Sequence, residues 1–127
     1  MDECCFCNYK ENKDEIAFEN DFCVCITNDD PILISSCMII PKAHKETPFD
    51  LSPEEWQATK DLLDKIKNHL DAKCNPDGYN LGWNIGSVAG QSVFHAHLHV
   101  IPRYKDEPYA GFGIRHWLKS SENKRPK

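Results

Sequence analysis

The sequence predicts an α+β domain in which an antiparallel sheet of about five strands packs against one long helix. One long stretch after Ser52 has the apolar spacing of a helix, and several short apolar runs on either side of it have the composition of strands. These strand and helix signals are segregated along the chain, which is typical of α+β domains. A chain of 127 residues suits one such domain, and no internal repeat or linker divides it. We expect the domain to occupy residues 1–118 and a polar tail to occupy residues 119–127.

The first three expected strands are short apolar runs separated by turn-forming residues. Residues 16–18 and 22–26 are typical of a hairpin-like pair, and the following Asn-Asp-Asp-Pro at 28–31 forms a turn by composition. Residues 37–41 are a third run, which ends at Pro41. The cysteines within these runs are expected to behave as small apolar residues: Cys23, Cys25 and Cys37.

The helix begins at Ser52-Pro53-Glu54-Glu55. Ser52 is the expected N-cap, Pro53 occupies the first helical position and Glu55 the third, which makes a capping box. The face expected to pack on the sheet follows three- and four-residue spacing: Trp56, Thr59, Leu63, Ile66 and Leu70. Residues 75–78, Asn-Pro-Asp-Gly, end the helix and turn the chain.

Two further strands are expected after the helix, over residues 79–85 and 91–102. Side chains alternate between the faces of a strand, so the second run has one apolar face and one face that carries three histidines. The apolar face holds Phe94, Ala96, Leu98 and Val100, and the other holds His95, His97 and His99.

Three interpretations of the histidine face stay open on the residues alone. A polar, solvated strand face would explain a lone histidine better than it explains three. A His-x-His pair can converge on one metal ion. Alternatively, one imidazole can act as a nucleophile while its second nitrogen is held by a hydrogen bond. The preceding loop, residues 86–92, contains glycines, Ser and Gln that could surround a phosphate, although an ordinary tight connection has the same composition.

Charge and cysteine content limit the partners and the compartment. Fifteen Lys and Arg against 20 Asp and Glu give a net charge of −5, which argues against a nucleic-acid polymer as partner but allows a small nucleotide. Seven cysteines are an odd number, and the N-terminus has neither the basic start nor the apolar core of a signal peptide. No apolar run approaches the ~20 residues that cross a bilayer. We therefore expect a soluble protein of the reducing cytoplasm, with no membrane partner.

Cys4 and Cys7 have the Cys-x-x-Cys spacing of half a tetrahedral zinc site, which needs two more nitrogen or sulfur ligands from elsewhere. A redox pair is the alternative, but redox pairs usually open a helix in a βαβ context, and strands follow here. Unpaired surface cysteines are a third possibility.

The segment from Gly90 to Arg103, Gly-Gln-Ser-Val-Phe-His-Ala-His-Leu-His-Val-Ile-Pro-Arg, resembles the motif of the histidine triad (HIT) proteins. The resemblance extends to Ile-Pro-Lys-Ala-His at 40–44 and to Cys-Cys-Phe-Cys at 4–7, so it spans most of the chain. Within the family the zinc-binding bacterial-type branch is the most similar. The resemblance implies hydrolysis or transfer at the α-phosphate of a nucleoside phosphoramidate or a dinucleoside polyphosphate, through a nucleotidyl-histidine intermediate.

The resemblance also implies a role for each residue of the site. Structural Zn²⁺ is expected on Cys4, Cys7, His44 and His95. The catalytic residues are expected to be His97 as nucleophile, His99 as proton donor to the leaving group, and Ser92. The substrate, a purine nucleotide, is expected to contact Asn28 through its ribose and Asn84, Gly90, Gln91, Ser92 and His99 through its phosphates.

The sequence departs from the family at Ser36, because many members have Gly-His where Ser35-Ser36 stand. Ser36 cannot carry charge at neutral pH, so the departure concerns substrate preference and turnover more than reaction class. HIT proteins form two-fold dimers, which implies a homodimer in which the segment around Trp117 reaches the partner's pocket. A non-enzymatic zinc- or nucleotide-binding protein is the alternative to an enzyme.

Overall fold

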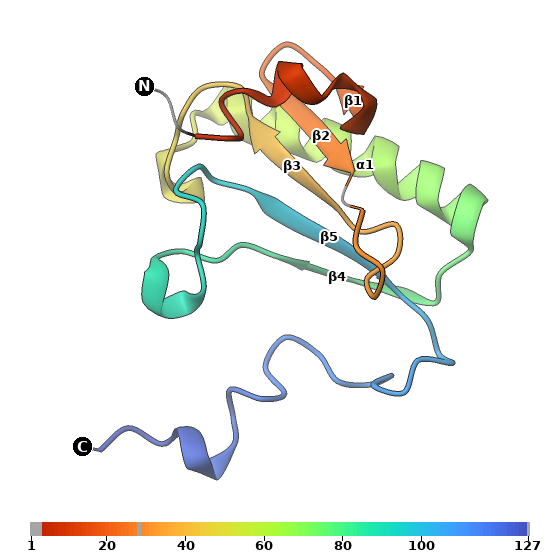
Figure 1. The fold of residues 1–127 in the computed structure, drawn as a ribbon, viewed down its shortest axis with the longest axis vertical. Helices are drawn as coiled ribbons and strands as arrows, with labels where there is room; N and C mark the ends of the chain where they lie inside the picture. The colour runs from red at the N-terminus through yellow and green to blue at the C-terminus, as the bar shows by residue number, and fades with distance from the viewer. Residues whose placement is uncertain (1–3, 28, 127) are drawn as a thin grey trace.

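The computed structural model describes residues 4–27 and 29–126, and in this part of the chain one long helix packs on a five-stranded antiparallel sheet. The strand order is β1-β2-β3-β5-β4, and Figure 1 shows the sheet with α1 behind it. The predicted fold class is therefore confirmed. The elements are η1 (Tyr9–Glu15), β1 (Ile16–Glu19), β2 (Cys23–Thr27), β3 (Cys37–Pro41), η2 (Pro48–Asp50), α1 (Pro53–Cys74), β4 (Gly78–Gly82), η3 (Ser87–Ala89), β5 (Leu98–Arg103) and η4 (Ser121–Asn123).

Helix α1 begins and ends as its sequence predicts. The Ser52 hydroxyl accepts a hydrogen bond from the Glu55 N–H, and the Glu55 carboxylate accepts one from the Ser52 N–H, so the capping box is complete. At the other end Asn75 adopts the left-handed conformation (φ 49°, ψ 55°), and its N–H donates to the Asp71 carbonyl. Asn tolerates this conformation better than most residues, which allows the chain to leave the helix here.

The buried face of α1 differs from the predicted one at Trp56. The helix packs on the sheet through a line of residues four apart: Ala58, Leu62, Ile66 and Leu70. At 3.6 residues per turn, Trp56 lies about 120° around the helix from Leu62. Its side chain is therefore 45% exposed and contacts the ring of Trp83 instead of the core.

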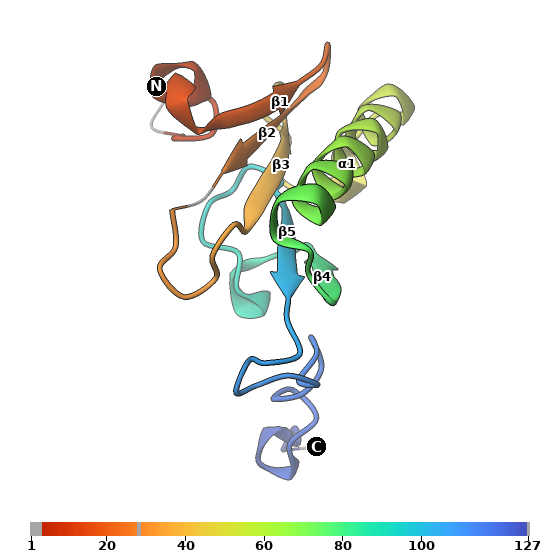
Figure 2. The same cartoon turned by 90° about the vertical axis from the view of Figure 1, so that its right-hand side faces the viewer.

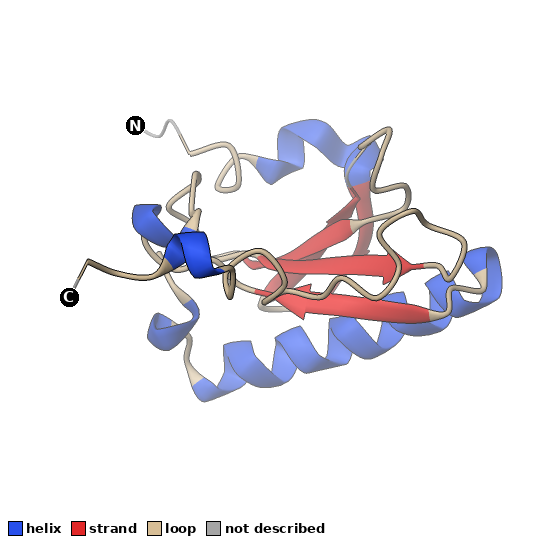
Figure 3. Ribbon diagram, turned by 90° about the horizontal axis from the view of Figure 1, so that it is seen from below, coloured by secondary structure: helices blue, strands red, loops and turns tan. Residues whose placement is uncertain are grey.

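Both faces of the sheet are covered. On the α1 side, Cys23, Cys25 and Cys37 are buried among apolar side chains, as predicted for small apolar residues. On the opposite side, Val24, Ile26 and Ile40 are covered by the N-terminal segment, whose Tyr9 is 6% exposed. Figures 2 and 3 show this arrangement, with α1 on one face and η1 on the other. The segment that carries Cys4 and Cys7 is thereby held against the sheet.

The histidine strand is shorter than predicted, since β5 begins only at Leu98. The register with β3 pairs Ile39 with Leu98, so continuing it would place Ala96 opposite Pro41. Pro41 has no N–H to donate to a ladder. The Ala96 N–H instead donates to the Lys45 carbonyl at 2.6 Å. His95 and His97 therefore precede the strand, and only His99 lies in it.

The strand before it is also shorter than predicted. In the β4–β5 register Gly82 pairs with His99, so residues beyond 83 would need partners before the start of β5. The chain leaves the sheet after Gly82, and Asn84 becomes part of the loop that leads to η3. Among the described residues, no helix is long and apolar enough to cross a membrane.

Candidate functional site

Four potential metal ligands converge beyond the end of β3. Cys4 and Cys7 come from the N-terminal segment, His44 follows β3, and His95 precedes β5. One ligand atom from each lies within 4.8 Å of the others. The Cys7 Sγ is 3.1 Å from the His44 Nδ1, and the His95 Nδ1 is 3.5 Å from the Cys4 Sγ and 3.6 Å from the Cys7 Sγ. These four residues could hold one metal ion.

The backbone fixes the orientation of His95. Its Nε2 lies 2.7 Å from the Pro41 carbonyl oxygen, which can only accept, so Nε2 carries the proton and Nδ1 faces the two thiols. Burial lowers the pKa of this imidazole and favours the neutral form that ligates metals. Histidines that bind metals usually donate their second N–H to a carbonyl in this way. The donor set of two cysteines and two histidines thus fits a metal of the structural zinc type.

The second histidine, His97, is presented differently. Its Nδ1 lies 2.8 Å from the carbonyl oxygen of His95, so Nδ1 donates and the lone pair of the ring is on Nε2. The side chain is 6% exposed, and the ring contacts Phe6 at 5.1 Å and His99 at 4.9 Å between centroids. His97 therefore has a fixed tautomer with its Nε2 available to react.

His99 is half-buried in β5 beside His97. Burial, followed by the proximity of His97, lowers the pKa of His99 below its usual value. The neutral imidazole is thereby favoured, with one N–H that can donate a hydrogen bond to a phosphate oxygen, and the protonated form is a stronger acid toward a leaving group.

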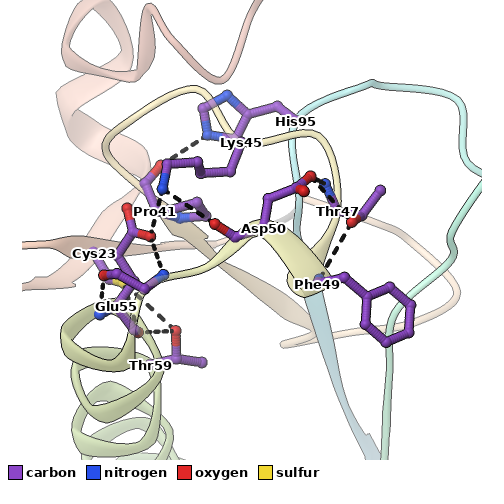
Figure 4. A network of polar contacts seen from close by, with 10 residues as sticks. Cys23, Pro41, Lys45, Thr47, Phe49, Asp50, Glu55, Thr59 and His95 are labelled. Carbon is purple, nitrogen blue, oxygen red and sulfur yellow. Dashed lines mark hydrogen bonds and ion pairs between the residues drawn. The ribbon is translucent and has the colours of Figure 1, made fainter.

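A short connection after β3, residues 44–50, supports the triad from the side; we call it the strap. The Lys45 carbonyl accepts the Ala96 N–H, and the Lys45 ammonium lies 3.0 Å from the Glu55 carboxylate and 3.2 Å from the Asp50 carbonyl. Figure 4 shows Lys45 between Asp50 and Glu55, with His95 bound to Pro41 nearby. The strap thereby connects the start of α1 to the segment that carries His95 and His97.

The loop of residues 86–92 lies beside Asn84. The Asn84 amide carbon is 3.7 Å from the position of a Cβ on Gly90, and Gly86 and Gly90 have φ values of 87° and 101° that favour glycine. The Gly90 N–H donates to the Ser87 carbonyl at 3.0 Å. Ser92 is exposed, and its hydroxyl makes no hydrogen bond within the described part of the chain. The predicted ribose ligand, Asn28, lies outside the described residues.

Ser35 and Ser36, which stand where many family members have Gly-His, each have an unfavourable feature in this structure. Ser35 has φ 68°, a conformation that glycine adopts without cost. Ser36 is 4% exposed, and its hydroxyl has no hydrogen-bond partner in the described residues. Neither serine supplies a charge near the triad.

Sequence reasoning missed a small cavity between the N-terminal segment and the sheet. Its volume is about 140 Å³, and it is lined in part by Phe6, Tyr9, Ile26 and Met38. Two of its lining residues neighbour the histidines: Phe6 contacts His97, and Met38 pairs with His99 across β3 and β5. The one sequence signal for this cavity was Phe6, an aromatic residue that lies between two cysteines.

The fold and the site define a class: a small α+β domain with two adjacent histidines, His97 and His99, beside a Cys₂His₂ cluster. The chain belongs to the HIT family, since the family model described as HIT domain matches residues 9–106. Adenylylsulfatase HINT3 from Arabidopsis thaliana is 33% identical over 105 residues, which are 81% of this chain and 53% of that protein. The chain thus spans about half the length of that relative.

Solved structures agree with this membership. A HIT family protein from Bacillus anthracis has a TM-score of 0.75 at 36% identity, covering 83% of this chain and 76% of the other. A Zn-bound histidine triad family protein from Mycobacterium smegmatis has a TM-score of 0.72 at 28% identity, covering 84% and 78%. The Arabidopsis thaliana relative is named for an activity on a nucleotide, as an adenylylsulfatase.

Proposed function

We propose that this protein cleaves at the α-phosphate of a nucleoside phosphoramidate or a dinucleoside polyphosphate, through a nucleotidyl intermediate on His97. One observation carries the proposal. The His97 Nδ1–H is engaged by the His95 carbonyl, which leaves the Nε2 lone pair as a nucleophile beside the N–H of His99. A neutral imidazole is a competent nucleophile without a strong base.

The reaction has two balanced steps. The His97 Nε2 forms a bond to the α-phosphorus as the bond to the leaving group breaks, and His99 in its protonated form gives one proton to the departing amine or phosphate and becomes neutral. Water then attacks the same phosphorus, the proton that the water loses returns to His99, and the bond to the His97 Nε2 breaks, which releases the nucleoside monophosphate and restores both imidazoles. The Ser92 hydroxyl donates to a phosphoryl oxygen, and such donors are most effective where negative charge develops.

The remaining substrate contacts follow from the loop and the cavity. Asn84 and Gly90 lie side by side and are proposed to line the phosphate pocket. Asn28 is proposed as the ribose ligand. The cavity lined by Phe6 and Tyr9 is proposed to take the purine base, because aromatic walls stack on it.

We propose that the Cys₂His₂ cluster holds a structural zinc ion. Its donor set and the Zn-bound Mycobacterium smegmatis relative support this proposal. Zinc would join the N-terminal segment to the strap and to the triad through His95, and a liganded His95 cannot attack phosphorus. Elemental analysis should find about one zinc per chain, and a Cys4→Ser/Cys7→Ser double variant with full zinc content would overturn the assignment.

A cytoplasmic homodimer completes the proposal. Strand β4 is at the edge of the sheet, where Leu81 is 42% exposed. The segment after β5 leaves the sheet, as Figures 1 and 2 show, and its Trp117 is 65% exposed. Pairing of two sheets would cover such an edge, and Trp117 is proposed to tune specificity at the partner's pocket. A monomer in sedimentation at micromolar concentration, or unchanged substrate ranking in Trp117→Ala, would contradict these points.

The test of the function is turnover of adenosine phosphoramidate. Wild type should release AMP, and His97→Ala should lose most of kcat while its AMP affinity stays within a few-fold. His69→Ala is the control, since His69 is exposed on α1 and should not affect turnover. Near-normal turnover by His97→Ala would leave zinc or nucleotide binding without catalysis as the better account.

A further inference from the structure

Gln91 is buried beside the proposed phosphate loop, and its side chain is fully engaged within the protein. Only 4% of the residue is exposed. Its Oε1 accepts the Gly86 N–H at 2.8 Å, and its Nε2 donates to the Glu46 carbonyl at 2.8 Å and to the Val93 carbonyl at 3.1 Å. Both N–H groups of the amide and its oxygen therefore already have partners, which is the arrangement expected of a buried amide.

These bonds close the loop on itself. The side-chain oxygen of Gln91 holds the Gly86 N–H, while the backbone N–H of Gln91 donates to the Gly86 carbonyl at 3.0 Å. Gly86 has φ 87°, so the start of the loop uses a backbone conformation that needs glycine. The two residues together fix the separation between the beginning and the end of the loop.

The same amide joins the loop to the strap. Glu46 receives the Gln91 N–H, and the preceding carbonyl of Lys45 receives the Ala96 N–H. Two consecutive carbonyls of the strap thus hold residues 91 and 96, and the segment between them carries Ser92 and His95. Because Lys45 is bound to Glu55 at the start of α1, this support is connected to the N-terminal end of the helix.

We infer that Gln91 is a positioning residue that sets Ser92 and His97 relative to each other, and that it does not contact the phosphate. The inference rests on the proposed function and replaces the substrate contact that the sequence suggested for Gln91. Only an amide can accept from Gly86 and donate to two carbonyls at once. Asn is one methylene shorter, and Glu would place a carboxylate against two carbonyl oxygens.

The expected effect is on catalysis and loop rigidity together. Displacing a reacting group by about 1 Å can cost roughly 100-fold in rate. Gln91→Ala should therefore lower kcat by roughly 10- to 100-fold and speed amide hydrogen exchange at Gly86 and Ala96 by at least about tenfold. Gln91→Glu should keep Gly86 protected, because its acceptor oxygen remains, but should speed exchange at Ala96.

The experiment measures amide exchange in the nucleotide-free protein, kcat with adenosine phosphoramidate, and AMP affinity. Ser92→Ala is the matched comparison: it should lower kcat with no change in exchange at Gly86 or Ala96. Gln57→Ala removes an exposed glutamine on α1 and should change nothing. The exchange measurement needs no turnover, so it tests Gln91 even if the proposed reaction is wrong.

Two results would overturn the inference. In the first, Gln91→Ala keeps wild-type exchange at Gly86 and Ala96 while AMP affinity falls, as for a direct phosphate ligand. In the second, kcat and exchange both stay at wild-type values. If Gln91→Ala does not fold, Gln91→Glu decides, because equal protection of Gly86 and Ala96 at wild-type levels in that variant also contradicts a positioning role.

Discussion

Replacing Glu55 with Gln tests whether the start of α1 stabilises the strap beside the site. Glu55 is 5% exposed, and its carboxylate accepts the Ser52 N–H at 2.7 Å and the Lys45 ammonium at 3.0 Å. Gln preserves the shape and one acceptor but removes the charge that faces Lys45. The variant therefore isolates the charge-dependent part of the interaction.

The magnitude follows from these contacts. Hydrogen bonds to charged groups contribute about 1.5–3 kcal/mol. The Lys45 side chain is 31% exposed, so solvent screening reduces its share. We expect Glu55→Gln to lower the free energy of unfolding by about 1–2 kcal/mol at pH 7.

The stability lost in Glu55→Gln should depend on pH, which gives a second test of the same interaction. Burial alone would raise the pKa of the Glu55 carboxyl, but the Ser52 N–H and the Lys45 ammonium outweigh it, and the net pKa is lowered. The carboxylate thus stabilises the fold at pH values above the unfolded pKa of about 4.3, and this contribution is lost as the pH falls through the folded pKa. The difference between wild type and Glu55→Gln should therefore shrink below about pH 4.

Urea unfolding of both proteins at pH 7 and at low pH measures these quantities. Asp64→Asn is the control, because the Lys60–Asp64 pair has the same charges on exposed side chains (63% and 57%). Asp64→Asn should lower the free energy of unfolding by less than about 0.5 kcal/mol. A Glu55→Gln variant as stable as wild type at pH 7, or a deficit that persists unchanged in acid, would refute the reasoning.

Three further predictions concern the core, the loop before β3 and the metal. Leu62 is fully buried, so Leu62→Ala should lower the free energy of urea unfolding by about 2–5 kcal/mol; a loss under about 1 kcal/mol would contradict the assigned core. Ser35→Gly should raise the free energy of urea unfolding by about 0.5–1 kcal/mol, because glycine adopts the positive φ of this position without strain. The variant also loses the 3.4 Å contact between the Cys74 thiol and the Ser35 hydroxyl, and a destabilised variant would show that this contact matters more than the strain. A chelator should lower the Tm of wild type but not of Cys4→Ser/Cys7→Ser, and equal shifts in both would exclude the Cys₂His₂ cluster as the site of the effect.

The sequence predicted an end of a helix or strand correctly where a particular residue determines that end. The start of α1 is set by the Ser52 capping box, and β3 ends at Pro41 as predicted. The histidine strand was predicted too long because side-chain alternation continues into residues that no longer pair with β3. The length of a strand depends on the N–H donors that its neighbouring strand offers. Here the neighbour lacks the N–H at Pro41, which is 55 residues away in sequence from Ala96, the residue that would pair with it.

Some parts of the candidate site could be predicted from the sequence and others could not. Cys4, Cys7, His44 and His95 converge as the resemblance implied, although spacing alone could supply only the cysteine pair. The direction of the Gln91 amide could not be predicted, because motif spacing does not say which partners a side chain meets. The catalytic and substrate roles, including that of Asn28, stay predictions.

The most direct test of the central claim is rapid quench of the enzyme with radiolabelled adenosine phosphoramidate. A nucleotidyl-histidine intermediate predicts a labelled adduct that is labile in acid and stable in base, located on His97 by peptide mass spectrometry. The adduct should form and decay at rates compatible with turnover and should be absent from His97→Ala. Turnover without a trapped adduct, or an adduct located on His95 or His99 instead, would contradict the account.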